Sequence, residues 1–333
     1  MLRMQPFTAH YPTTLDDVTA LLDAHGASAM ICAGGTDVVP NLKHELFAPE
    51  HVIHLAHVHG LHGITEHSDK ITIGSTTTID AIASNNLLQT HAPGLCDAAS
   101  HVAGPQLRRM GTLGGNLCLD TRCLYYNQTY FWREALGFCL KKDGTTCHVT
   151  QTGKRCVAAS SNDTATMLIC LDAKVDLVAK SGLRTLSLID FYKADGMKNN
   201  VLSPGELLLR VHVPKADSTI KRLEGFAKLR HRSSIDYPML SVGVRFDVDD
   251  DLQIKNARAT LNALAAKPKV IQTDWLTGIR LDEATINQLA DYTYARCTPL
   301  TNICDDPDWR KEMVRVYMKR ACQNALARLE ARA

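Results

Sequence analysis

The chain has 333 residues, of which 45% are hydrophobic and 22% are charged, as in an ordinary globular protein. This length predicts two or three domains. Basic residues exceed acidic residues by only two, 37 against 35, so the net charge excludes a strong field for nucleic acid or anionic lipid. No apolar run approaches the ~20 residues of a membrane span, and the start lacks a signal-peptide pattern. We therefore expect a cytoplasmic protein that binds neither nucleic acid nor membranes.

Helix and strand signals follow one another over the first hundred residues. Thr14 to Asp17 has the pattern of a capping box, with leucines at helical spacing behind it and Gly26 to end the helix. Residues 28–32 predict a short buried strand that runs into a glycine turn. Further short strands are expected at 51–55 and 70–75, and helices at 78–88 and 94–102.

The second half of the chain shows alternating apolar residues. This alternation predicts strands at 175–179 and 207–213, and a hairpin in which 242–248 turns at 249–251 into a partner strand at 252–264. A long terminal helix is expected after Asp306-Pro307. Because helices and strands do not alternate regularly, the predicted fold class is α+β.

Histidines are frequent near the N-terminus. Of the 14 in the chain, seven lie between His44 and His67. No pair has helical metal-ligand spacing with an acidic residue nearby, so we interpret most of these seven as surface loop residues.

Two glycine-rich segments are candidates for a ligand site. One is Ala33 to Asp37, AGGTD, and the other is Gly111 to Asn116, GTLGGN. Glycine lets the backbone approach a ligand, and successive N–H groups form a concavity suited to a pyrophosphate. Neither segment has the spacing of a Rossmann or P-loop motif. Taken singly, each segment is better explained as a structural turn.

Together, AGGTDVVPN and AGPQLRRMGTLGGN resemble the FAD-binding subunits of the xanthine oxidase family of molybdenum hydroxylases. The resemblance implies a two-part FAD-binding domain of the molybdopterin dehydrogenase flavoprotein type. It also implies a small C-terminal domain with an antiparallel three-stranded sheet and helices. The expected boundaries are 1–56 and 57–217 for the two FAD-binding parts and 218–333 for the C-terminal domain.

The same resemblance implies which residues bind FAD. Residues 30–37 would cover the diphosphate, Asp163 would bind the sugar region, and Leu208 and Lys228 would lie near the isoalloxazine and the end of the cofactor. No residue of the chain would act chemically on the organic substrate. The complete expected set is Met30, Ile31, Cys32, Ala33, Gly34, Gly35, Thr36, Asp37, Thr112, Gly115, Asn116, Asp163, Leu208 and Lys228.

Five of the eleven cysteines fall within the 39 residues from Cys118 to Cys156. A reducing cytosol disfavours disulfides, so this group predicts a metal or iron–sulfur site. The last four have the spacing C-x15-C-x7-C-x8-C, which fits either a tetrahedral zinc site or four ligands of a cubane cluster. The spacing alone leaves both open.

An insertion at about 118–158 carries these cysteines, and it resembles the one in the β subunits of 4-hydroxybenzoyl-CoA reductases, which function in aromatic degradation. That resemblance implies a [4Fe–4S] cluster on Cys123, Cys139, Cys147 and Cys156, with Cys118 packed on the flavin side. It also implies a large molybdopterin subunit, a small subunit with [2Fe–2S] clusters, a heterohexamer, and ferredoxin or a similar electron carrier. The alternatives are a sister enzyme for another aromatic or steroid substrate, and a zinc-stabilised assembly protein without redox function.

Overall fold

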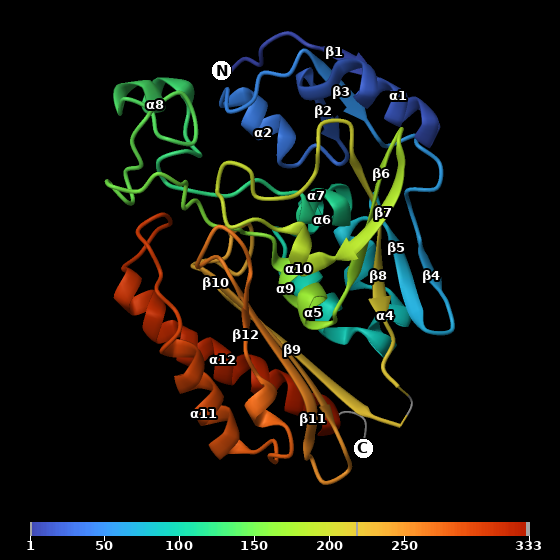
Figure 1. The fold of residues 1–333 in the computed structure, drawn as a ribbon, viewed down its shortest axis with the longest axis vertical. Coiled ribbons are helices and arrows are strands. Elements are labelled where there is room, and N and C mark those ends of the chain that lie inside the picture. Colours follow the sequence, from blue (N-terminus) through green and yellow to red (C-terminus); the bar gives the residue numbers. More distant parts are fainter. Residues whose placement is uncertain (1, 218, 331–333) are drawn as a thin grey trace.

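Three sheets organise the chain (Figure 1). The computed structural model describes residues 2–217 and 219–330. The sheets follow one another along the sequence, and each has its own helices. None of the helices in these residues is both long and apolar enough to cross a bilayer.

The first sheet is parallel and has the strand order β1-β3-β2. The helix α1 begins as predicted, because the Thr14 hydroxyl accepts a hydrogen bond from the Asp17 N–H at 3.1 Å, and Gly26 ends it. Its buried Val18 and Leu22 pack against Ile53 of β3. The elements are β1 (Thr8–His10), α1 (Leu15–His25), a 3-10 turn (Gly26–Ser28), β2 (Ala29–Cys32), α2 (Val38–Lys43) and β3 (His51–His54).

The second sheet is antiparallel and has the order β4-β5-β8-β6-β7. Ile71, Ile73 and Val211 on its strands pack against Leu168 of α9. The elements are β4 (Ile64–Glu66), β5 (Lys70–Gly74), α3 (Ile79–Ala83), α4 (Asn86–His91), α5 (Pro93–Ser100), α6 (Pro105–Met110), α7 (Leu113–Leu117), α8 (Tyr130–Ala135), α9 (Asp163–Cys170), β6 (Lys174–Ala179), β7 (Gly182–Ser187), α10 (Leu188–Phe191) and β8 (Leu207–Pro214).

Three local predictions in this part were wrong. The helix expected over 78–88 is two helices, because Asn85 caps a new one through the Leu88 N–H. The strand β7 was missed because its side chains are mostly exposed and show no apolar alternation. The glycines at 114 and 115 lie in the short helix α7 rather than in a turn, and the Thr112 hydroxyl caps this helix at 3.2 Å from the Gly115 N–H.

The third sheet is antiparallel with the order β12-β11-β10-β9. It therefore has four strands rather than the three that the resemblance implies, and the additional β12 pairs over only three residues. The helices α11 and α12 cover one face, and α5 and α9 contact the other (Figure 1). The elements are β9 (Lys221–Leu229), β10 (Leu240–Val248), β11 (Ile254–Asn262), β12 (Lys269–Ile271), a 3-10 turn (Asp274–Leu276), α11 (Glu283–Tyr294) and α12 (Pro307–Glu330).

The cysteine-rich insertion is mostly irregular, and α8 is its one helix within the described residues. It extends from the body of the protein beside α2 (Figure 1). Arg133 anchors α8: its side chain is 1% exposed, donates to the Glu45 carbonyl at 3.0 Å and lies 3.3 Å from the Asp143 carboxylate. By contrast, Phe131 on the same helix is 78% exposed.

Candidate cofactor sites

A cavity of about 610 Å³ lies between the first two sheets and is bordered by the loop before β10. A volume of this size suits a cofactor-sized ligand. Of the residues expected to bind FAD, twelve line this cavity: Met30, Ile31, Ala33, Gly34, Gly35, Thr36, Asp37, Thr112, Gly115, Asn116, Asp163 and Leu208. The structure thus brings together segments that are more than a hundred residues apart in sequence.

Cys32 and Lys228 lie behind the wall of the cavity. Cys32 is 7% exposed, and burial raises the pKa of its thiol. The ammonium of Lys228 donates to Asp163 Oδ2 at 2.5 Å and to the His101 carbonyl at 2.9 Å. Lys228 therefore holds Asp163 in place from the far side.

The glycines at the cavity have two different roles. A Cβ on Gly34 would meet the carbonyl oxygen of Met110 at 1.7 Å, and one on Gly114 would meet Ser75 Cβ at 2.9 Å. These two positions need glycine because backbone segments pack against each other. Gly35 has φ +70°, which favours glycine. At Gly115 a Cβ would meet only the Thr112 hydroxyl, at 3.1 Å, so the space in front of it belongs to the cavity.

Asn116 joins α7 to α9, and Asp163 joins α9 to the third sheet, at the wall of the cavity. Asn116 Oδ1 accepts hydrogen bonds from the Thr164 hydroxyl at 2.5 Å and from its N–H at 3.3 Å. Asp163 Oδ1 accepts one from the Ser241 hydroxyl at 2.7 Å. Both side chains are therefore fixed before any ligand arrives.

Asp37, Arg122 and Tyr237 meet at the mouth of the cavity. Arg122 forms an ion pair with Asp37, and the Tyr237 hydroxyl donates to Asp37 Oδ1 at 3.1 Å. The guanidinium carbon of Arg122 lies 4.4 Å from the centre of the Tyr237 ring. Sequence reasoning missed Tyr237, because 200 residues separate it from Asp37 and no local motif marks it.

The loop before β8 was also missed as part of this site. Residues 202–207 line the cavity together with Asn200. The local signal there is the turn sequence Ser203-Pro204-Gly205, which is typical of a connection between strands rather than of a ligand contact.

A second, much smaller cavity of about 20 Å³ lies in the insertion. Cys123, Cys139, Cys147 and Cys156 all line it. Cys118 lines the large cavity instead, and burial raises the pKa of its thiol to about 12, which keeps it protonated. The four cysteines grouped by the resemblance therefore meet in space, and the fifth lies apart.

Hydrogen bonds and charge shape the environment of the four thiols. Cys147 Sγ accepts hydrogen bonds from the Thr150 N–H and hydroxyl at 3.5 and 3.4 Å. Burial alone would raise the pKa of Cys147, but these bonds together with the backbone at Val149 and Val157 lower it. Burial, reinforced by the three neighbouring thiols, raises the pKa of Cys123 to about 12. Four thiolates this close together would repel one another, so a cationic centre is needed to deprotonate them all.

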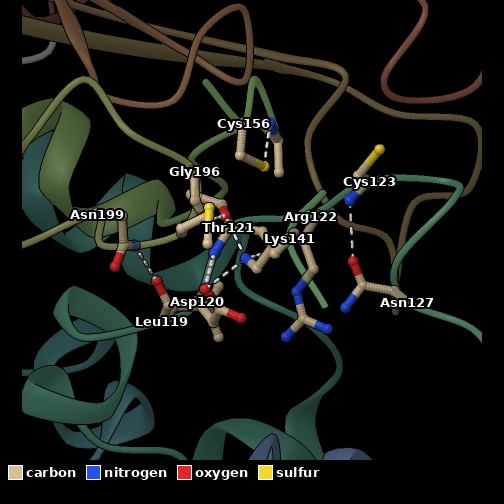
Figure 2. A network of polar contacts seen from close by, with 12 residues as sticks. Leu119, Asp120, Thr121, Arg122, Cys123, Asn127, Lys141, Cys156, Gly196 and Asn199 are labelled. Carbon is tan, nitrogen blue, oxygen red and sulfur yellow. Dashed lines mark hydrogen bonds and ion pairs between the residues drawn. The ribbon is translucent and has the colours of Figure 1, made fainter. Parts of the chain in front are cut away.

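A polar network joins the two cavities (Figure 2). The buried ammonium of Lys141 donates to Asp120 Oδ1 at 2.7 Å and to the Thr121 hydroxyl at 2.6 Å, and that hydroxyl donates to the Gly196 carbonyl at 2.6 Å. The side-chain amide of Asn199 donates a hydrogen bond to the Leu119 carbonyl at 2.9 Å. Residues 119–122 are thereby fixed between Cys118 at one cavity and Cys123 at the other.

Comparison with known proteins assigns the fold to a family. Residues 5–216 match the FAD binding domain in molybdopterin dehydrogenase, and residues 225–325 match the CO dehydrogenase flavoprotein C-terminal domain. The chain belongs to the FAD-binding subunits of the xanthine oxidase family of molybdenum hydroxylases. It is therefore a subunit of a multi-subunit molybdenum oxidoreductase, and its cofactor is FAD.

Relatives in this family cover most of the chain. It is 25% identical over 325 residues to the carbon monoxide dehydrogenase medium chain of Afipia carboxidovorans, covering 97% of each chain. It is 30% identical over 206 residues to the xanthine dehydrogenase FAD-binding subunit of Escherichia coli O157:H7, covering 62% of this chain and 56% of the relative. The solved structure of the Cu,Mo-CO dehydrogenase superposes with a TM-score of 0.79 at 25% identity, over 98% of this chain and all of that chain.

The predicted FAD-binding fold with its C-terminal domain is thus confirmed. The large cavity also fits FAD chemically, because it offers bare backbone at Gly35 and Gly115, apolar walls, and a fixed carboxylate at Asp163. The roles of individual residues toward FAD, and the metal of the insertion, remain predictions.

Proposed function

We propose that this subunit carries FAD and a [4Fe–4S] cluster in a complex of the 4-hydroxybenzoyl-CoA reductase type. The observation that carries the proposal is the cavity shared by Cys123, Cys139, Cys147 and Cys156. Four thiols and no carboxylate are the donor set for an iron–sulfur cluster or for zinc. They lie in an insertion beside the FAD cavity, where a second redox centre could exchange electrons with the flavin.

The spacing of the sulfur atoms favours the cluster over zinc. A tetrahedral zinc with bonds of ~2.3 Å would place its four sulfurs ~3.8 Å apart. Among the described residues, two groups of three possible ligands have their donor atoms within 4.8 Å of one another, and neither group includes these cysteines. A cubane interposes four irons between its thiolates and so needs the wider spacing.

The residues around the two cavities have separable roles. The backbone at 34–37 and at Gly115 would receive the FAD diphosphate, and Asp163 would hold the sugar region. The thiols of the insertion would hold the cluster, with Thr150 donating to Cys147 and the Ala158 N–H to Cys156. Flavin exchanges one or two electrons, which suits a junction between one-electron centres.

The two redox sites would be close enough for direct exchange. Cys118 at the FAD cavity and Cys123 at the cluster cavity are five residues apart in the chain. An extended chain of that length spans at most about 18 Å. The network around Lys141 holds this segment in one conformation.

The assembly follows from the same proposal. The named relatives are medium chains and FAD-binding subunits, so this chain would join a large molybdopterin subunit and a small subunit with [2Fe–2S] clusters. We expect a cytoplasmic heterohexamer that exchanges electrons with ferredoxin or a similar carrier. Within the chain, we propose domain boundaries near residues 56 and 217, which fall between β3 and β4 and between β8 and β9.

Two alternative functions share some features with this proposal. A sister molybdenum enzyme for another aromatic or steroid substrate would use the same subunit, because the substrate would bind to the partner that holds molybdenum. A zinc-stabilised assembly protein would keep the cysteine site but not its redox role. The glycine backbone and the fixed Asp163 at the large cavity speak against that second alternative.

Metal analysis with single cysteine variants tests the proposal. The anaerobically purified chain should contain about four irons and one FAD, and serine at position 123, 139, 147 or 156 should remove the iron signal. Cys118→Ser is the matched control and should keep its iron. About one zinc and no iron per chain would refute the redox role of the insertion.

A further inference from the structure

Three histidines from different elements meet at one edge of the first sheet. His10 ends β1, His51 begins β3, and His25 ends α1. Because β1 and β3 are parallel with Thr8 opposite His51, the side chains of His10 and His51 lie on the same face of the sheet. The last turn of α1 brings His25 over that face.

The three imidazole rings are in close contact. The rings of His25 and His51 are stacked, with centroids 3.7 Å apart, and the His10 ring lies 5.3 and 5.2 Å from them. His10 Nε2 lies 3.0 Å from His51 Nδ1. One nitrogen from each ring lies within 4.8 Å of the other two, and all three residues are half-buried.

We infer that His10, His25 and His51 bind one divalent transition-metal ion, with zinc as the reference ion. Zinc accepts three imidazole nitrogens at ~2.0–2.1 Å and can keep a fourth position for water. Tetrahedral geometry then places the nitrogens about 3.4 Å apart, close to the observed 3.0 Å between His10 and His51. Rotation of the His25 ring brings in the third nitrogen.

The surroundings of the rings favour neutral imidazoles, which can bind a metal, over protonated ones. Burial lowers the pKa of His25, and His51 and His10 lower it further, while Glu50 acts in the opposite direction. Neutral imidazole is the form that binds metal. Of the three rings, His10 and His51 share a hydrogen bond, and a metal ion would take one lone pair from each of the three at once.

The site is independent of the iron–sulfur proposal, because its histidines line neither the FAD cavity nor the cavity of the four cysteines. It would still affect FAD binding. Gly26 and Ala27, directly after His25, line the FAD cavity, and Ala29 at its wall pairs with His51 across the sheet. A metal ion here would fix the end of α1 against the sheet and so hold that wall in place.

Zinc stoichiometry measured on the full FAD-containing chain tests the inference. The cysteine cavity could also take zinc, so the measured quantity is the difference in zinc equivalents between wild type and each variant after equilibrium dialysis. We expect His10→Gln, His25→Gln and His51→Gln each to lose one equivalent. His59→Gln, at an exposed histidine of the same region, should lose none. Equal zinc content in wild type and in FAD-replete His51→Gln would overturn the inference.

A second measurement covers variants that fail to fold. X-ray absorption at the zinc edge of the loaded wild-type chain should show the multiple scattering of imidazole ligands. A purely sulfur coordination shell would contradict the site, even if no histidine variant can be purified. Zinc should also raise the melting temperature of wild type and of His59→Gln, because a ligand that binds only the folded state stabilises it.

Discussion

Gly34 and Gly115 both present bare backbone at the FAD cavity, but their surroundings predict different consequences of substitution. Gly34 packs on the Met110 carbonyl, so any side chain there disrupts the fold itself. Gly115 faces the cavity, with only the Thr112 hydroxyl close to its α-carbon. A substitution at Gly115 therefore separates loss of cofactor from loss of structure.

We predict that Gly115→Val folds but binds FAD weakly. Overpacking costs about 1–3 kcal/mol, which weakens binding about 5- to 150-fold. Flavin absorbance per chain after gel filtration measures the effect, and circular dichroism checks the fold. Gly34→Val is the comparison and should yield little folded protein. Full flavin content in Gly115→Val would contradict the assigned cavity.

Lys228 is predicted to act on FAD through Asp163. The pair is buried, with side chains 1% and 4% exposed, so Lys228→Met leaves an unpaired carboxylate. Breaking such a pair costs about 3–5 kcal/mol in the free energy of unfolding, which urea titration measures. Lys228→Met combined with Asp163→Asn should recover part of this loss. Lys215→Met, which breaks the more exposed pair with Glu66, should cost less than about 1 kcal/mol.

The residues that sequence could identify are those in compact motifs. The segments 30–37 and 112–116 can be recognised by their glycines. All of their predicted residues except Cys32 line the cavity. Tyr237 has no such signal, because its partner Asp37 comes from another domain and only folding brings them together. His51 lies in a strand that the sequence predicted at 51–55, but its contact with His10 and His25 has no local signal, because only the pairing of β1 with β3 and the end of α1 bring the three rings together.

At the scale of elements, the buried contacts of Lys141 hold the insertion in place. Lys141 is buried among Asp120, Thr121 and the ring of Tyr126. Burial raises the pKa of Cys156, and the Ala158 N–H and the charge of Lys141 offset part of that rise. Its neighbour Lys142 is 36% exposed and pairs with Asp143. The two adjacent lysines therefore form a matched pair for measuring the effect of charge on the proposed cluster.

We predict that Lys141→Met lowers the reduction potential of the cluster and that Lys142→Met leaves it nearly unchanged. Reduction adds negative charge, which a buried ammonium favours. A contribution of about 1 kcal/mol corresponds to about 40 mV for one electron. Redox titration followed by electron paramagnetic resonance gives the midpoints. Asp120→Asn should shift the midpoint upward, and equal shifts in both lysine variants would contradict a local effect.

The contact between β9 and α5 predicts a pH-dependent stability. Glu224 accepts a hydrogen bond from the Gly94 N–H at 2.9 Å, and burial raises its pKa from 4.5 to about 7. Between these two values the folded state keeps a proton that the unfolded chain has released. The free energy of unfolding therefore falls as pH rises from about 4.5 to about 7, by up to about 3 kcal/mol from this group.

Glu224→Gln should remove this dependence, because an amide oxygen can still accept from Gly94 but cannot ionise. We expect the variant to gain stability relative to wild type between pH 5 and pH 8, by about 1–3 kcal/mol. Urea unfolding at the two pH values measures the change. Glu283→Gln, at an exposed position in α11, is the control. Its free energy of unfolding should change with pH as that of wild type does. A constant difference between Glu224→Gln and wild type at both pH values would contradict the assignment.

Elements with strong periodicity were predicted well, and those with weak periodicity were not. The cap of α1 and the hairpin of β10 and β11 follow from Thr14 and from alternating apolar residues. The strand β9 was missed because it carries the buried charges Glu224 and Lys228, which interrupt an apolar pattern. Only partners from other elements, Gly94 and Asp163, make those charges compatible with a central position.

At the scale of the whole molecule, the two candidate sites differ in how a redox partner would reach them. The FAD cavity is enclosed by residues of the first two sheets and of the loop before β10. The insertion extends from the body beside α2 (Figure 1), and α8 exposes Tyr130, Phe131 and Trp132 by 40%, 78% and 40%. A protein electron carrier would therefore meet the insertion first.

Removal of the cluster should consequently separate two routes of flavin reduction. Cys139 is 8% exposed at the cavity lined by the four cysteines, and Cys139→Ser should remove the proposed cluster. We predict that FAD reduction by low-potential ferredoxin slows at least about tenfold, equivalent to about 1.4 kcal/mol in the barrier. Reduction by a small dye that reaches the flavin directly should stay at the wild-type rate. Stopped-flow absorbance of the assembled complex measures both rates, with Cys304→Ser, an exposed cysteine outside the insertion, as the control. An unchanged ferredoxin rate in a cluster-free, FAD-replete variant would mean that electrons bypass the insertion, and its four thiols would then serve only to hold the loop together.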